Sequence, residues 1–151
     1  MMKYSPEASL ALAIALAVID GIETYIGVIL LGGVEEGQLT RAFISHYGVI
    51  GLVADDLLTV GIAVIFYLMA RQGGVIGLMG LITLNTANGL RIAIVASNAF
   101  TLITDSGAII PMVIACGVII GIAFNAPLIM RLIKGHYRLT HGSSSSLKTT
   151  G

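Results

Sequence analysis

The sequence is poor in the residues that cover the surface of a soluble domain. It has no tryptophan, one cysteine and three prolines, and only 11% of its 151 residues are charged, whereas 56% are hydrophobic. Its mean hydropathy of +0.97 lies far outside the range of soluble domains. The lone Cys116 cannot form an internal disulfide, and a formal net charge of zero gives no reason to expect nucleic acid as a partner. The composition therefore predicts one integral membrane domain with the lipid bilayer as its solvent.

Long apolar stretches predict the fold. A transmembrane helix needs about 20 mostly apolar residues. Four stretches meet this requirement, at about 8–33, 47–70, 75–103 and 108–133. We expect an all-α, integral membrane four-helix bundle over residues 1–133. The polar residues 134–151, with the serine run Ser143 to Ser146, predict a disordered tail.

The basic residues predict the orientation. Four spans put both termini and the second loop on one side of the membrane. That side carries Lys3, Arg71, Arg131, Lys134, Arg138 and Lys148. The other side carries Arg41 alone. Because basic residues are enriched in cytoplasmic loops, we expect a multi-pass protein of the cell membrane with both termini, and therefore the tail, in the cytoplasm.

Four acidic residues lie inside the apolar stretches, where an ionisable group is costly and usually lines a polar pathway or meets a partner. They are Asp20, Glu23, Asp55 and Asp56. Arg91 is the one basic residue at a comparable depth. At 1.5 Å per residue, all five lie roughly 18–24 Å from the inner ends of their helices. Three predicted helices therefore contribute to one charged layer.

Helical spacing groups further polar residues with this layer. Asp20, Glu23 and Thr24 share one face of the first helix. The predicted intramembrane polar cluster comprises Asp20, Glu23, Thr24, Asp55, Asp56, Asn85, Asn88 and Arg91. Adjacent Asp55 and Asp56 point about 100° apart on a helix, so we do not expect both to face one small site. We expect Arg91 to pair with one or two of Asp55, Asp56 and Glu23.

One arginine cannot neutralise four carboxylates. Fully ionised, the layer carries about three excess negative charges, which hydrocarbon does not tolerate. Three arrangements resolve this: protonated carboxyls, a bound cation, or a face open to water or to another subunit. In the second arrangement, the cation could be a metal ion bound by the carboxylate oxygens of Asp20, Glu23 and Asp56. The sequence does not identify this metal. A purely structural cluster that fixes helix packing is the competing interpretation.

Small and amide residues predict the helix contacts. Gly117 and Gly121 lie four residues apart, a spacing that lets helices approach closely within the bundle or in a dimer. Asn85 and Asn88 are expected to form interhelical hydrogen bonds rather than to bind a ligand. Asn125 lies beside Pro127, where we expect a kink, and is expected to satisfy the backbone that the proline frees.

One motif in the first helix resembles a known pattern. Asp20 and Thr24 form an Asp-x-x-x-Thr, followed by Gly32 and Glu35 as Gly-x-x-Glu. This is similar to small polytopic, mostly archaeal, prokaryotic membrane proteins of unknown function. The resemblance implies a small helical membrane architecture and no known activity. The chain departs from the pattern at two places. Glu36-Gly37-Gln38 stands where those proteins have an Asn-Pro, and Asp56 lies near the position in the second helix where they usually have a lysine.

No motif in the sequence indicates catalysis or a cofactor. Thr104-Asp105-Ser106-Gly107 is similar to an aspartic-protease loop, but we interpret it as a turn between helices. Two functional hypotheses follow, and the first is favoured over the second. The first is a non-catalytic accessory subunit of a larger membrane complex, whose polar faces and glycines contact other membrane subunits. The second is a small homo-oligomeric transporter or channel that binds a proton or cation at the acidic cluster.

Overall fold

The protein is all-α. The computed structural model describes residues 5–35, 37–104 and 110–142. In chain order the elements are α1 (Pro6–Thr24), the π-helix η1 (Tyr25–Leu30), α2 (Gln38–Tyr47), α3 (Val49–Arg71), α4 (Gly74–Thr104) and α5 (Ile110–Gly142). Four helices are long and apolar enough to cross a membrane: Pro6–Leu30, Val49–Arg71, Gly74–Thr104 and Pro111–Met130. The all-α class and the four apolar helices predicted from sequence are thereby confirmed.

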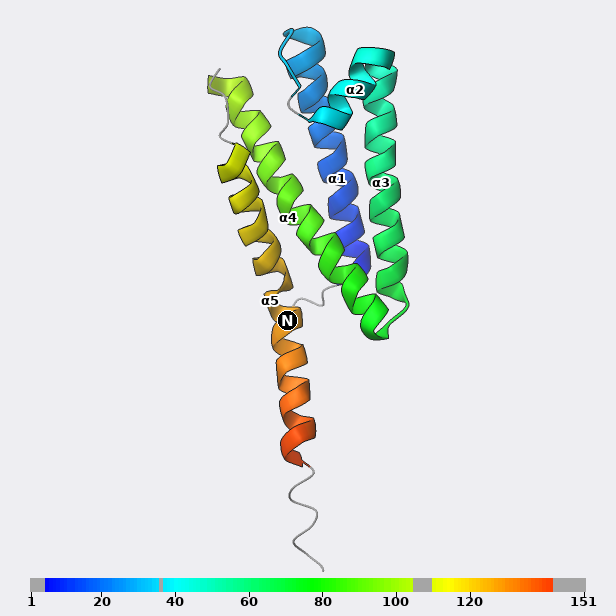
Figure 1. Cartoon of the computed structure of the whole chain (residues 1–151), viewed down its shortest axis with the longest axis vertical. Coiled ribbons are helices and arrows are strands. Elements are labelled where there is room, and N and C mark those ends of the chain that lie inside the picture. Colours follow the sequence, from blue (N-terminus) through cyan, green and yellow to red (C-terminus); the bar gives the residue numbers. More distant parts are fainter. Residues whose placement is uncertain (1–4, 36, 105–109, 143–151) are drawn as a thin grey trace, which may run out of the picture.

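The long helices do not surround one common core. α1, α3 and α4 pack against one another, and α5 packs almost entirely on α4, on the side away from α1 and α3 (Figure 1). The expected four-helix bundle is therefore a three-helix cluster with a fourth helix attached to one member. Many large apolar side chains are exposed, among them Leu31, Ile50 and Val75. Such a surface suits hydrocarbon as the surrounding solvent.

Helix boundaries follow local chemistry. The side chain of Ser5 accepts a hydrogen bond from the Ala8 amide at 3.1 Å, and Pro6 occupies the first turn, so α1 begins slightly before the predicted boundary. Between α3 and α4, Gly73 and Gly74 have φ of 74° and 58°. Glycine adopts these left-handed values without steric cost, which permits the tight reversal between the two helices.

α2 was not predicted from the sequence, because it does not form a long apolar stretch. It is amphipathic and only 10 residues long, too short to span a bilayer. Gly48 ends it with φ of 59°, so Tyr47 belongs to α2 and α3 starts at Val49. α2 packs on α3, where a side chain at Gly51 would collide with the carbonyl of Phe43. The end of the bundle that carries α2 is called the α2 end below.

α5 is longer than predicted. It continues to Gly142, whereas the polar tail was expected to begin at Lys134. The prediction was wrong because polarity limits a membrane span but not a helix, and lysine and arginine are good helix formers. Residues 143–151, with the serine run, lie outside the described residues. The same holds for 105–109, which include most of the predicted Thr104 to Gly107 turn and the predicted start of the last span.

Glycines bring α4 and α5 into backbone contact. A Cβ on Gly89 would collide with the backbone nitrogen of Gly121 and lie 2.8 Å from the carbonyl oxygen of Gly117. A Cβ on Gly117 would lie 2.8 Å from the Cα of Leu90. The Gly117 and Gly121 pair therefore faces α4 within the chain. These glycines therefore permit the close approach of α5 to α4.

Candidate functional site

Arg91 is bound to Asp20. Its Nη2 and Nε donate to Asp20 Oδ2 at 2.9 and 3.3 Å, and Asn98 Nδ2 donates to Asp20 Oδ1 at 3.0 Å. The two charged side chains are only 18% and 17% exposed. The predicted pairing of Arg91 with Asp55, Asp56 or Glu23 is therefore wrong. Arg91 and Asp20 do lie at the same level of their helices. The rotation of each helix selects the partner, and spacing within one helix does not determine that rotation.

Asp55 and Asp56 face different neighbours. Asp55 is buried beneath α2, where its Oδ2 accepts a hydrogen bond from the Thr40 hydroxyl at 2.8 Å. The carboxyl of Asp56 instead lies against Gly21 of α1, and any side chain there would collide with it. This divergence agrees with the 100° that separates adjacent helical positions. Asp55 therefore holds α2 on α3, and only Asp56 faces the helix that carries Asp20 and Glu23.

The asparagines form a separate buried network among α1, α4 and α5. The Ser9 hydroxyl donates to Asn85 Oδ1 at 2.7 Å, Asn88 Nδ2 donates to the Ser9 carbonyl at 2.8 Å, and Asn85 Nδ2 donates to Asn125 Oδ1 at 3.2 Å. Asn125 Nδ2 donates to the Gly121 carbonyl at 3.0 Å. Pro127 lacks the amide that would bond the carbonyl of Ala123, so the freed carbonyl is that of Ala123 and not the Gly121 carbonyl that Asn125 contacts. The role expected for Asn125 is therefore corrected: its bond with Asn85 links α5 to α4.

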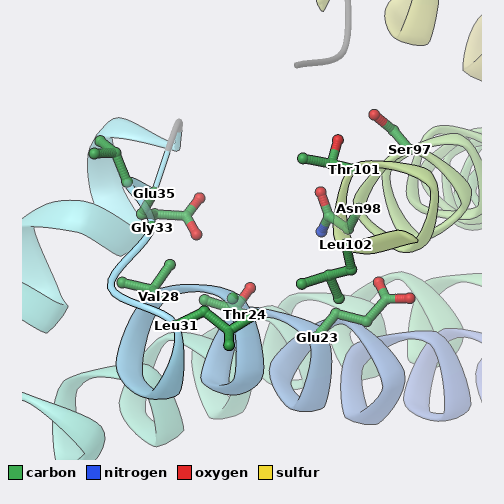
Figure 2. A pocket seen from close by; sticks show the side chains of 12 residues that line it. Glu23, Thr24, Val28, Leu31, Gly33, Glu35, Ser97, Asn98, Thr101 and Leu102 are labelled. Carbon is green, nitrogen blue, oxygen red and sulfur yellow. The ribbon is translucent and has the colours of Figure 1, made fainter. Parts of the chain in front are cut away.

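A cleft opens between the end of α1 with η1 on one side and α4 on the other. Its volume is about 290 Å³. Its polar lining consists of Glu23, Thr24, Glu35, Ser97, Asn98 and Thr101. Its apolar lining includes Val28, Leu31, Val34 and Leu102. Figure 2 shows the Glu35 carboxyl pointing across the cleft toward the polar side chains of α4, whereas the Glu23 side chain runs from α1 past Leu102 and beneath α4, away from Glu35. The cleft is therefore lined by two acidic residues, and the Glu35 carboxyl faces a wall of hydroxyl and amide groups.

Glu23 carries the unusual atom of this cleft. Its Oε2 is buried and has no hydrogen-bond partner within the described part of the chain. A buried polar atom without a partner costs about 1–3 kcal/mol, and more when it is charged. The π-helix η1 follows directly after Thr24, and π-helical turns occur frequently at functional sites. A proton or a cation at Glu23 would remove this cost.

Glu35 is positioned by the segment that follows η1. The Gly33 amide donates to the Gly27 carbonyl at 2.9 Å, which turns the chain back over the cleft. Glu35 Oε1 accepts from the Gly37 amide at 2.8 Å, and the Glu35 carbonyl accepts from Arg41 Nε at 2.6 Å. Burial raises the pKa of the Glu35 carboxyl; the Gly37 amide opposes this shift. The cleft therefore favours a neutral Glu35 or a bound positive charge.

The structure divides the predicted cluster into parts. Glu23 and Thr24 line the cleft, and Asp20 with its partner Arg91 adjoins the cleft through Asn98. The other four residues lie elsewhere: Asp56 is against Gly21 of α1, and Asp55, Asn85 and Asn88 serve helix contacts. Sequence reasoning did not include Glu35, Ser97, Asn98 and Thr101 in the site. The three-residue spacing of Asn98 and Thr101 was available as a signal. Within the described ranges, no group of three or more histidine, cysteine or acidic residues could hold a metal ion.

The chain matches no protein-family model, no curated protein and no solved structure.

Proposed function

We propose that this chain is a small membrane transporter or channel that binds a proton or cation in the cleft at the α2 end. The observation that carries the proposal is Glu23, a residue that lines the same cleft as Glu35 and whose Oε2 is buried with no hydrogen-bond partner among the described residues. Asp20 has Arg91, and Asp55 has Thr40. Glu23 lacks such compensation.

The proposal includes an orientation. Both termini are in the cytoplasm of a multi-pass protein of the cell membrane, because the basic residues accumulate on that side. The α2 end, with its cleft, then faces the outside. Glu23 lies within the span Pro6–Leu30 and Glu35 lies beyond it, so the two carboxyls form two successive positions for a positive charge entering from outside.

Reconstitution into liposomes tests the proposal. The purified chain is placed in liposomes with a potassium gradient and a pH-sensitive dye, and proton and potassium movements are compared with those of protein-free liposomes. Movement of either ion that requires the protein supports the proposal. Liposomes as tight as the protein-free ones, with correctly folded chain present, contradict it.

A second candidate function is a non-catalytic accessory subunit of a larger membrane complex. The observation that favours it is the attachment of α5, which packs almost entirely on α4 and leaves exposed apolar residues such as Met112, Ile119 and Ile122. Purification of the tagged chain from its native membrane in mild detergent, followed by mass spectrometry, separates the two functions. A stoichiometric partner supports the subunit; the chain alone or as a homo-oligomer supports the transporter.

A further inference from the structure

We infer that the cleft takes a small organic ammonium ion, a primary or secondary amine with an apolar body, in preference to a bare metal ion. The inference rests on the proposed function, because it names the class of cation for the same site. Four properties of the lining support it: its charge, its size, its apolar wall and the kind of acceptor that it presents.

The charge of the cleft selects a cation. Glu23 and Glu35 both line it, and no lysine, arginine or histidine is among its lining residues within the described chain. The nearest arginine in the membrane layer, Arg91, is already bound to Asp20. A positive ligand meets the Glu35 carboxyl across the cleft and Glu23 beside it, whereas an anion would meet two like charges that Arg41, bound to the Glu35 carbonyl, offsets only in part.

The size and composition of the cleft disfavour a bare metal ion. A volume of about 290 Å³ lies near the lower end of the range for small-molecule pockets, roughly 300–1,000 Å³. Calcium and magnesium require about six or more oxygen ligands in a compact shell. The described residues contain no cluster of three metal-binding side chains. A calcium or magnesium ion would therefore lack a compact set of acidic side-chain ligands among the described residues.

The apolar wall provides a place for a carbon body. Val28, Leu31 and Leu102 line the cleft together with the polar groups (Figure 2). An amine that carries an apolar group can direct its ammonium to the carboxyls and bury its carbon atoms against these side chains. Burial of apolar surface contributes about 25 cal/mol per Å², a gain that is not open to a hydrated inorganic ion.

The acceptors favour an ammonium that carries N–H groups. Carboxylate oxygens and the hydroxyls of Thr24, Ser97 and Thr101 accept hydrogen bonds. Asn98 already donates its Nδ2 to Asp20, which leaves its amide oxygen as an acceptor. Quaternary ammonium ions are recognised instead by aromatic faces. The described lining of the cleft contains no phenylalanine, tyrosine or tryptophan.

Calorimetric titration of the full chain in lipid nanodiscs tests the inference, with 2-phenylethylammonium as the probe. The neutral 2-phenylethanol and the quaternary trimethyl(2-phenylethyl)ammonium serve as ligand controls, and empty nanodiscs correct for partition into lipid. We expect the primary amine to bind at least tenfold more tightly than either control. Equal binding of the amine and the alcohol overturns the inference, as does equal or tighter binding of the quaternary ion.

Variants locate the binding. Glu23→Gln and Glu35→Gln are each expected to weaken the amine at least tenfold, while Glu7→Gln, an exposed glutamate in the first turn of α1, leaves it unchanged. Amine binding that survives both cleft substitutions overturns the inference. If a variant fails to fold, the comparison of the three ligands on the unmodified chain still tests the inference. If the liposomes show ion movement but the nanodisc titration shows no amine binding, only this inference is contradicted. If the amine binds but the liposomes show no ion movement, only the proposed transport is contradicted.

Discussion

Arg91 donates from both Nη2 and Nε to a single oxygen of Asp20, Oδ2, and so joins α4 to α1 within the membrane layer. Glu23, one turn further along α1, has a buried oxygen with no hydrogen-bond partner among the described residues. The one arginine of the layer is thus committed to one of its carboxylates. Arg91 is therefore not available as an ion-pair partner for Glu23.

The Asp20–Arg91 pair is expected to be coupled in a double-mutant cycle. Arg91→Ala leaves Asp20 with Asn98 as its described partner, and removal of one member of a buried pair costs about 3–5 kcal/mol. We expect Arg91→Ala and Asp20→Ala each to lower the thermal stability in detergent, and the double variant to lose less than the sum. Additive losses would show that the two side chains do not act as a pair.

The attachment of α5 is expected to depend on Gly89. Its Cβ would collide with Gly121, so Gly89→Ala forces α4 and α5 apart. Overpacking of this kind typically costs about 1–3 kcal/mol. Gly61→Ala is the matched control, because a Cβ there meets nothing within 4 Å, and alanine is a better helix former than glycine by roughly 1 kcal/mol. Thermal unfolding followed by circular dichroism should show a loss for Gly89→Ala and none for Gly61→Ala. Equal effects would contradict the described α4–α5 contact.

α2 is expected to be held on α3 by the hydrogen bond from Thr40 to Asp55. A hydrogen bond to a charged group contributes about 1.5–3 kcal/mol, so Thr40→Val should raise amide hydrogen exchange in α2 by roughly tenfold or more. Thr83→Val, at an exposed position of α4, is the control. Exchange in α2 that is the same in both variants would mean that other contacts hold this helix.

Glu35 is expected to make stability depend on pH. Burial raises its pKa above the ordinary value of 4.5, and the carboxylates of Asp20 and Asp55 add to the shift, against the Gly37 amide and Arg41. The folded chain therefore retains this proton to a higher pH than the unfolded chain, and the stability that it provides is lost as pH rises above 4.5.

Glu35→Gln, which mimics the protonated group, removes this dependence. The melting temperature of the variant minus that of the unmodified chain should rise as pH increases above 4.5. A difference that stays constant with pH would show that Glu35 is solvated in the folded chain as it is in the unfolded one.

The helices were predictable where they are apolar and long. Length and hydropathy located the four spans, but they could not reveal α2, which is short and amphipathic, or the extension of α5 past Ile133, which is polar. Both missed segments are stabilised as helices without being membrane spans. A criterion based on hydrocarbon thickness therefore cannot detect them.

The contact between α1 and α4 was predictable in its level along the helices but not in its partners. Counting residues placed Asp20, Glu23 and Arg91 in one layer, whereas the choice of Asp20 by Arg91 depends on the relative rotation of α1 and α4. Glu35 could not be placed from sequence. It reaches the cleft because η1 is a π-helix and the following segment turns back, and no proline in this segment marks that change of helical geometry.

The most direct test of the account compares Glu23→Gln with Glu7→Gln in liposomes that carry equal amounts of folded chain. Glutamine keeps the size of the side chain and removes its charge and its exchangeable carboxyl proton. If the Glu23 carboxyl binds the transported proton or cation, ion movement should fall at least tenfold in Glu23→Gln and stay at the unmodified level in Glu7→Gln. Equal movement in both variants would contradict the central claim.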